Sequence, residues 1–183
     1  LAQARAHPCH HLLPPQPHNM AAAMWTSKLG GKYPKEEIQK QDAAAQRELK
    51  RLRGLKDRGN HLCADCGAQD SSWASVSHGV FICVTCSDVH RSVGTHVSKV
   101  KGCTGTYLWG PDELERMQTM GNRRADQIYG AEKVDRGARK EEKQRFVLRK
   151  YREQAQAASA QAERSPEQPA AAQQPLPPRQ QQQ

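Results

Sequence analysis

Four cysteines are spaced in a way that suits metal binding. Cys63 and Cys66 form one C-x-x-C pair, and Cys83 and Cys86 form a second, with sixteen residues between the pairs. A C-x-x-C turn directs two thiolates at one ion, and two such turns supply the four sulfur ligands of a tetrahedral Zn²⁺ site. Because four sulfurs leave no open coordination position, the spacing predicts one structural zinc ion rather than a catalytic one.

Two other uses of paired cysteines fit this chain less well. Disulfide scaffolds are typical of small secreted proteins, and the first residues do not resemble a secretory signal. A redox-active site needs one C-x-x-C pair rather than two at this spacing. Cys9 and Cys103 lie outside the pattern, so we expect Cys9 to be a free thiol and Cys103 a small, partly buried apolar side chain.

Composition indicates a small core and a preference for anionic partners. Hydrophobic residues make up 36% of the 183 residues and aromatic residues 5%, so a zinc site would compensate for limited apolar burial. The net charge of +9 favours nucleic acid, a phosphoinositide-rich membrane or an acidic protein face. No segment approaches the roughly 18 apolar residues of a membrane span. We expect a soluble protein in a reducing compartment.

The chain divides into three regions by composition. Residues 1–31 are rich in Pro and His without periodicity, and we expect a disordered leader in which Met20 or Met24 could be the true initiator. A functional metal site at the leader histidines is not expected. Residues 32–155 are expected to form the zinc domain with an N-terminal helix. Residues 156–183 are rich in Gln, Pro and Ala and are expected to be a disordered tail.

Hydrophobic patterning predicts an α+β fold. An apolar stripe from Ile38 to Leu55 predicts a helix over 34–57, ended by Gly59, whose basic face is expected to be solvated. Alternating residues predict a hairpin with strands at 73–76 and 80–82, and a third strand near 97–100. Further helices are predicted at 87–93, 111–120, 125–129 and 139–158. We therefore expect a zinc-ribbon-like module in which about five α-helices surround a short three-stranded sheet.

Arg91 is the residue best placed for chemistry. It follows Cys86 by five residues, so the zinc site would fix the element that carries it. A guanidinium group is always charged and matches the oxygens of a phosphate. The spacing alone leaves open a structural role, in which Arg91 forms a salt bridge within the domain.

Four stretches resemble the ArfGAP domain, the GTPase-activating module for Arf-family small GTPases. They are CADCGAQDSSWAS from Cys63, GVFICVTCSDVHRSVGTHVSKVK from Gly79, WGPDELERMQTMGN from Trp109, and FVLRKYRE from Phe146. The resemblance covers roughly residues 45–153, and it combines the zinc spacing with the HR-x-x-G-x-H run. The small ArfGAPs of the stromal-membrane-associated type are the most similar group.

The resemblance implies a function and a set of site residues. The protein would bind a GTP-loaded Arf GTPase and insert Arg91 in trans as an arginine finger, which typically accelerates hydrolysis by 10³ to 10⁵. Trp73, Ile82 and His96 would contribute to the GTPase-facing surface, and His90 and His96 would orient the loop by hydrogen bonds. The protein would be an activator rather than a complete enzyme, because the GTPase supplies nucleotide, Mg²⁺ and water.

The same resemblance implies a location. Arf GTPases work on membranes, so we expect a cytoplasmic protein that is peripheral on Golgi or endosomal membranes and regulates membrane traffic. The basic helices could add contact with anionic lipid.

The sequence departs from the family pattern at three places. Asp88 replaces a usual Gly three positions before Arg91, so the two side chains could pair on a helix and restrain the finger. Ser77-His78 stands where Asn-Leu is common. The segment 102–108 is one residue longer and lacks the usual Leu-x-Leu-Asp pattern. These changes bear on GTPase choice and efficiency more than on fold.

Two alternatives belong to other functional classes. A basic chain with two C-x-x-C pairs is also compatible with a GATA-like zinc-ribbon nucleic-acid binder, which would show a steep salt dependence. The HR-x-x-G-x-H run and the helices after it are unexplained by DNA binding, so no nucleic-acid partner is expected. An adaptor that binds Arf with weak or no stimulation is the other alternative, suggested by Asp88.

Overall fold

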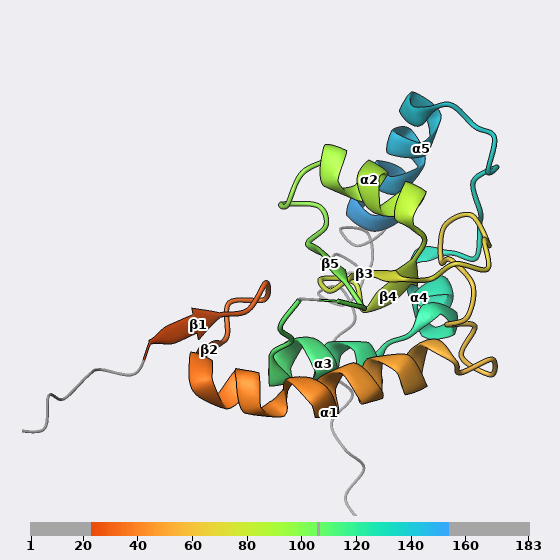
Figure 1. Cartoon of the computed structure of the whole chain (residues 1–183). Helices are drawn as coiled ribbons and strands as arrows, with labels where there is room; N and C mark the ends of the chain where they lie inside the picture. The colour runs from red at the N-terminus through yellow and green to blue at the C-terminus, as the bar shows by residue number, and fades with distance from the viewer. Residues whose placement is uncertain (1–22, 106, 154–183) are drawn as a thin grey trace, which may run out of the picture.

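A three-stranded antiparallel sheet lies at the centre of the molecule (Figure 1). The structure is a computed structural model that describes residues 23–105 and 107–153. Strand β3 (Trp73–Ser75) pairs with β4 (Val80–Ile82) on one side and with β5 (Val100–Gly102) on the other. The predicted hairpin and the three-stranded sheet are confirmed, although the third strand begins at the end of the predicted segment.

Helices cover both sides of this sheet. Helices α1 (Lys35–Arg53) and α3 (Pro111–Thr119) lie below it in Figure 1, and α2 (Val84–Ser92) and α5 (Lys140–Val147) lie above it. Helix α4 (Asn122–Tyr129) lies beside β4, and a π-helical turn, η1 (Leu148–Glu153), continues α5. The described residues therefore confirm the α+β class with about five α-helices.

The sheet separates two apolar clusters because successive strand side chains point to opposite faces. Val80 and Ile82 pack with the zinc-side cluster, which includes residues of α2, α5 and η1. Phe81 packs with the other cluster, which includes residues of α1 and α3. Both clusters are fully buried at their centres, so every residue of β4 is in the core.

The turn between β3 and β4 depends on a glycine. Gly79 has φ +68, and a Cβ atom there would lie 2.5 Å from Cβ of Met120. Its carbonyl accepts a hydrogen bond from the Gly121 N–H at 3.0 Å. A side chain at this position would be strained and would push away the end of α3.

The N-terminal region of the described chain forms a second, two-stranded sheet. Strands β1 (Met24–Thr26) and β2 (Lys32–Pro34) pair antiparallel. The expectation of a disordered leader up to residue 31 is therefore wrong for residues 23–31, and residues 1–22 lie outside the described residues. The hairpin is held by α3: the Ser27 hydroxyl donates to Asp112 at 2.5 Å, and the Lys28 N–H donates to Glu113 at 2.8 Å.

Two predicted helix boundaries are corrected. Helix α1 ends at Arg53, and the N–H of its C-cap residue, Gly54, closes the last turn. The helix therefore does not extend to residue 57 as predicted. The last predicted helix is α5 followed by η1, and residues 154–158 and the predicted tail lie outside the described part. No helix in the described residues is long and apolar enough to cross a membrane.

His78 occupies a buried position beside the β3–β4 turn. Its Nε2 donates to the Val97 carbonyl at 2.8 Å, and its ring centroid lies 4.5 Å from that of Tyr151. Burial lowers the pKa of His78 to about 4. The neutral ring is therefore the form that the fold accommodates.

This burial predicts a loss of stability in mild acid. The unfolded state binds a proton near pH 6.5 and the folded state only near pH 4, so stability falls as the pH drops through this window. We expect protonation of His78 in the unfolded state to lower the free energy of unfolding by about 3 kcal/mol across this window. Urea unfolding of wild type and His78→Leu between pH 7 and pH 4 measures it, because zinc release affects both proteins alike. Identical pH dependence in the two proteins would contradict this account.

Candidate functional site

The four predicted cysteine ligands come together at one point. Their Sγ atoms all lie within 4.8 Å of one another, and those of Cys66 and Cys83 are 3.7 Å apart. Two sulfurs bound to one tetrahedral zinc at about 2.3 Å would be about 3.8 Å apart. The residues present therefore fit one zinc ion with a closed set of ligands.

Each cysteine pair is positioned by a different local structure. In the first, the Cys63 N–H donates to the Ala68 carbonyl at 2.7 Å, and Gly67, with φ +68, closes the turn. In the second, Cys83 is the N-cap of α2, and its sulfur accepts a hydrogen bond from the Cys86 N–H at 3.4 Å. The positive end of the helix dipole favours the thiolates there.

The thiols influence one another strongly. Hydrogen bonds with the other three cysteines, followed by burial, raise the pKa of Cys63 well above its usual range. A hydrogen bond with Cys63 lowers the pKa of Cys66 to about 7. Four thiolates this close need a cation to be stable together. Cys103 lies outside this group, as expected, but it is fully rather than partly buried, and burial raises its pKa to about 12.

A buried polar network ties α2 to the first cysteine pair. Asp65, between Cys63 and Cys66, accepts hydrogen bonds from His90 Nε2 at 2.9 Å and from the Tyr151 hydroxyl at 2.6 Å. Burial opposes ionisation of Asp65, but the attraction of His90 and these hydrogen bonds outweigh it and lower its pKa. His90 thus links α2 to the first cysteine pair, and its Nδ1 shares a hydrogen bond with the Ser98 hydroxyl at 2.6 Å, which is a contact with the loop that the sequence predicted it to orient.

Arg91 lies in the last turn of α2. It forms an ion pair with Asp88, so the predicted helical pairing is present in the structure. The guanidinium carbon also lies 4.2 Å above the ring centroid of Trp73. The Arg91 side chain is 42% exposed and that of Asp88 67%, so the pair is at the surface. Nearby, Gln144 on α5 donates to the Ser92 hydroxyl at 2.8 Å and steadies the end of α2.

The three predicted partner-contacting residues differ in position. Trp73 is half-buried under Arg91. His96 is exposed on the loop after α2, where its ring covers Gly94 so closely that a Cβ there would lie 2.8 Å from it. Ile82 is fully buried in the zinc-side core, so the prediction that it contacts a partner directly is wrong. Both faces of the sheet are covered, which leaves no exposed side for β4.

Sequence reasoning missed one exposed apolar residue on the same helix. Val84 is 49% exposed and lines a hollow of about 330 Å³ together with Asp88, Val89 and two lysines of α5. Val84, Asp88 and Arg91 follow one another at spacings of four and three, which places them on one helix face. Once the helix is known, this spacing of Val84 from Asp88 and Arg91 is the sequence signal that places it on the same exposed face.

The fold and the site together define a zinc-stabilised α+β domain that presents an arginine at its surface. Residues 46–160, which are more than half of the chain, match the ArfGap family model, described as "Putative GTPase activating protein for Arf". The chain belongs to the ArfGap family, as its sequence motifs predicted. This membership supports the GTPase-activator class over a nucleic-acid binder.

Curated relatives agree with this assignment. The chain is 42% identical over 102 residues to ADP-ribosylation factor GTPase-activating protein AGD12 of Arabidopsis thaliana, covering 52% of this chain and 30% of that protein. It is 40% identical over 97 residues to Stromal membrane-associated protein 1 of Mus musculus, covering 53% of this chain and 21% of that protein. The matched part is thus less than a third of either relative.

A solved structure has the same fold. The ArfGap domain of HIV-1 Rev binding protein superposes with a TM-score of 0.54 and covers 66% of this chain and 92% of that chain. Its sequence identity is 23%, so this likeness concerns the fold alone.

Replacing one zinc ligand should remove the metal and unfold the domain. In Cys86→Ala only three sulfurs remain, and because zinc binding is coupled to folding, we expect loss of bound zinc and of the cooperative thermal transition. Cys103→Ala removes a buried thiol outside the cluster and serves as the control. Metal content measured by mass spectrometry should be one zinc per chain for wild type and the control. Full zinc content in Cys86→Ala would overturn the assignment.

Proposed function

We propose that this domain activates an Arf-family GTPase in its GTP form by supplying Arg91 as an arginine finger. One observation carries the proposal: Arg91 is exposed at the end of a helix whose start bears two zinc ligands and whose last turn is held by Asp65 through His90. A side chain on so rigid an element can be presented to a partner with little further loss of backbone freedom.

The proposed role of Arg91 follows from the charge of its guanidinium and of the γ-phosphoryl group of GTP. Negative charge on the transferring γ-phosphoryl group is spread over its oxygens, and a guanidinium placed beside them stabilises it. The GTPase would supply the nucleotide, Mg²⁺ and attacking water, so the domain is an activator and not a complete enzyme. Trp73, His96 and the newly found Val84 would surround the point of contact.

Asp88 and Trp73 would act as a restraint on the finger. An exposed ion pair contributes roughly 0 to 1 kcal/mol, and an exposed cation–π contact about 0.5 to 1 kcal/mol. A partner that engages Arg91 must first replace these contacts. Their sum is small beside the effect of an arginine finger, so the domain would remain active but less efficient.

The proposed location follows from the partner. Arf GTPases act on membranes, and we assign the protein to the cytoplasmic surface of Golgi or endosomal membranes, in membrane traffic. The net charge of +9 supports peripheral contact with anionic lipid.

Removing the finger should abolish stimulation without unfolding the domain. We expect Arg91→Ala to lower the stimulated rate of GTP hydrolysis by an Arf GTPase by about 10³-fold or more. Arg91→Lys should fail as well, because an ammonium lacks the planar fork. Single-turnover hydrolysis on liposomes measures the rate, with Arg47→Ala, an exposed arginine of α1, as the control. A folded, zinc-loaded Arg91→Ala protein that stimulates like wild type would refute the role.

Removing the restraint should have the opposite effect. Asp88→Ala keeps a good helix former in α2 and frees Arg91, so we expect kcat/KM for stimulation to rise about two- to fivefold. Asp57→Ala removes an exposed acid elsewhere and controls for the change in net charge. An equal rise in both variants would point to general electrostatics instead of the ion pair.

A further inference from the structure

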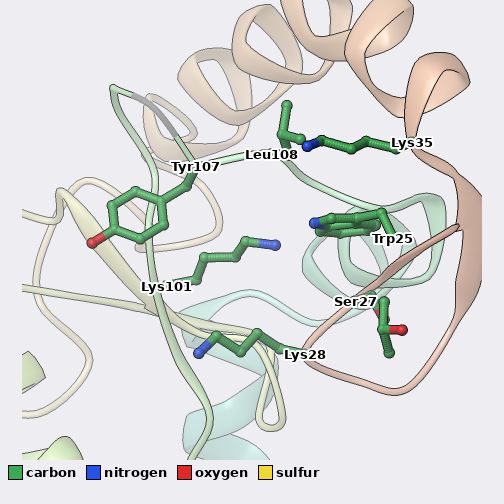
Figure 2. A pocket seen from close by; sticks show the side chains of 8 residues that line it. Trp25, Ser27, Lys28, Lys35, Lys101, Tyr107 and Leu108 are labelled. Carbon is green, nitrogen blue, oxygen red and sulfur yellow. The ribbon is translucent and has the colours of Figure 1, made fainter. Parts of the chain in front are cut away.

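A cavity of about 540 Å³ lies between the N-terminal hairpin and the segment around β5, away from the zinc site. Three lysines line it, Lys28, Lys35 and Lys101, together with the rings of Trp25 and Tyr107. Figure 2 shows Lys101 reaching toward Trp25, with Lys28 and Lys35 on opposite sides of the hollow. The volume is in the range of small-molecule sites.

Lys101 forms the buried part of this cavity. Its side chain is 4% exposed, and its Nζ donates to Glu113 at 2.5 Å. Its ammonium also lies 4.9 Å from the ring centroid of Trp25 and 5.1 Å from that of Trp109. The Glu113 carboxylate also accepts hydrogen bonds from the backbone N–H groups of Lys28 and Gly110. Its negative charge is therefore engaged by groups of the protein itself.

The two outer lysines carry charge that the described residues do not balance. Lys28 and Lys35 are exposed, and within residues 23–105 and 107–153 neither ammonium forms an ion pair. The pKa of Lys101 is lowered, first by burial and also by the charge of Lys28, while Glu113 and Asp112 act against this. Lys28 and Lys101 therefore repel each other, and an anion bound among the lysines of the cavity would offset this repulsion.

We propose that this cavity binds a small ligand carrying phosphate monoesters, such as a phosphorylated inositol headgroup. Lysine ammonium groups serve as point charges for phosphate oxygens. The Trp25 and Tyr107 rings offer flat apolar walls for the body of the ligand. The source can be a membrane lipid or a soluble phosphate ester, because both present the same group.

The cavity adjoins the surface formed by Arg91 and Trp73. The Tyr107 ring packs edge-on against Trp73 with centroids 5.7 Å apart, and Trp73 lies under Arg91. A ligand held here would lie on the same side of the domain as the proposed GTPase contact. The binding itself does not depend on Arg91, so it can fail or hold independently of the proposed function.

Calorimetric titration of the zinc-loaded full chain with inositol trisphosphate tests the site. We expect Lys28→Ala/Lys35→Ala to weaken binding about 30-fold, since each lysine near a phosphate surface contributes about fivefold. Lys40→Ala/Lys50→Ala removes the same charge from exposed positions of α1 outside the cavity and should bind like wild type. Arg91→Ala should also bind like wild type.

Vesicles then identify the source. Binding to phosphatidylcholine vesicles that contain phosphatidylinositol bisphosphate, but not to vesicles with phosphatidylserine at equal charge, would assign a lipid headgroup. Binding of free inositol trisphosphate without vesicle binding would assign a soluble phosphate ester. No binding by wild type, or equal weakening in both double-lysine variants, would overturn the site.

Discussion

The structure depends on four sulfur atoms that converge from two separate turns of the chain. One turn follows α1, and the other is the first turn of α2. A single ion bound between them joins a loop to a helix that short hydrophobic strands alone would hold weakly. Asp65, within the first turn, extends this connection by accepting hydrogen bonds from His90 on α2 and Tyr151 on η1. The direction of α2, and so the position of Arg91, follows from these contacts.

A second set of buried polar contacts organises the opposite side. Glu113, at the start of α3, accepts hydrogen bonds from Lys101 on β5 and from the backbone of Lys28 in the N-terminal hairpin. Because both Glu113 oxygens accept hydrogen bonds and Lys101 pairs with one of them, the charged pair can lie inside the fold without a large penalty. At the edge of the cavity, Lys28 and Lys35 have no acidic partner among the residues that the structure describes. The proposed arginine finger, Arg91, and the lysine-lined cavity thus lie on one side of the domain.

Much of this architecture could be predicted from local sequence. The cysteine spacing identified the zinc ligands, the alternation around Ser77 to Gly79 identified the hairpin, and the interval between Asp88 and Arg91 identified the ion pair. These features depend on residues close in sequence. The N-terminal hairpin was missed because its anchors, Asp112 and Glu113, follow about 85 residues later. Ile82 was placed at a partner surface because its burial depends on helices that cover both faces of the sheet.

The central claim is that Arg91 reaches the transferring phosphoryl group of a partner GTPase. Aluminium fluoride with GDP mimics that group in the transition state, so complex formation with it reports the finger's contact directly. Size-exclusion chromatography of the domain with a GDP-bound Arf GTPase, with and without aluminium fluoride, is the measurement. The account predicts a complex for wild type only when aluminium fluoride is present, and none for Arg91→Ala. Equal complex formation by both proteins would contradict it.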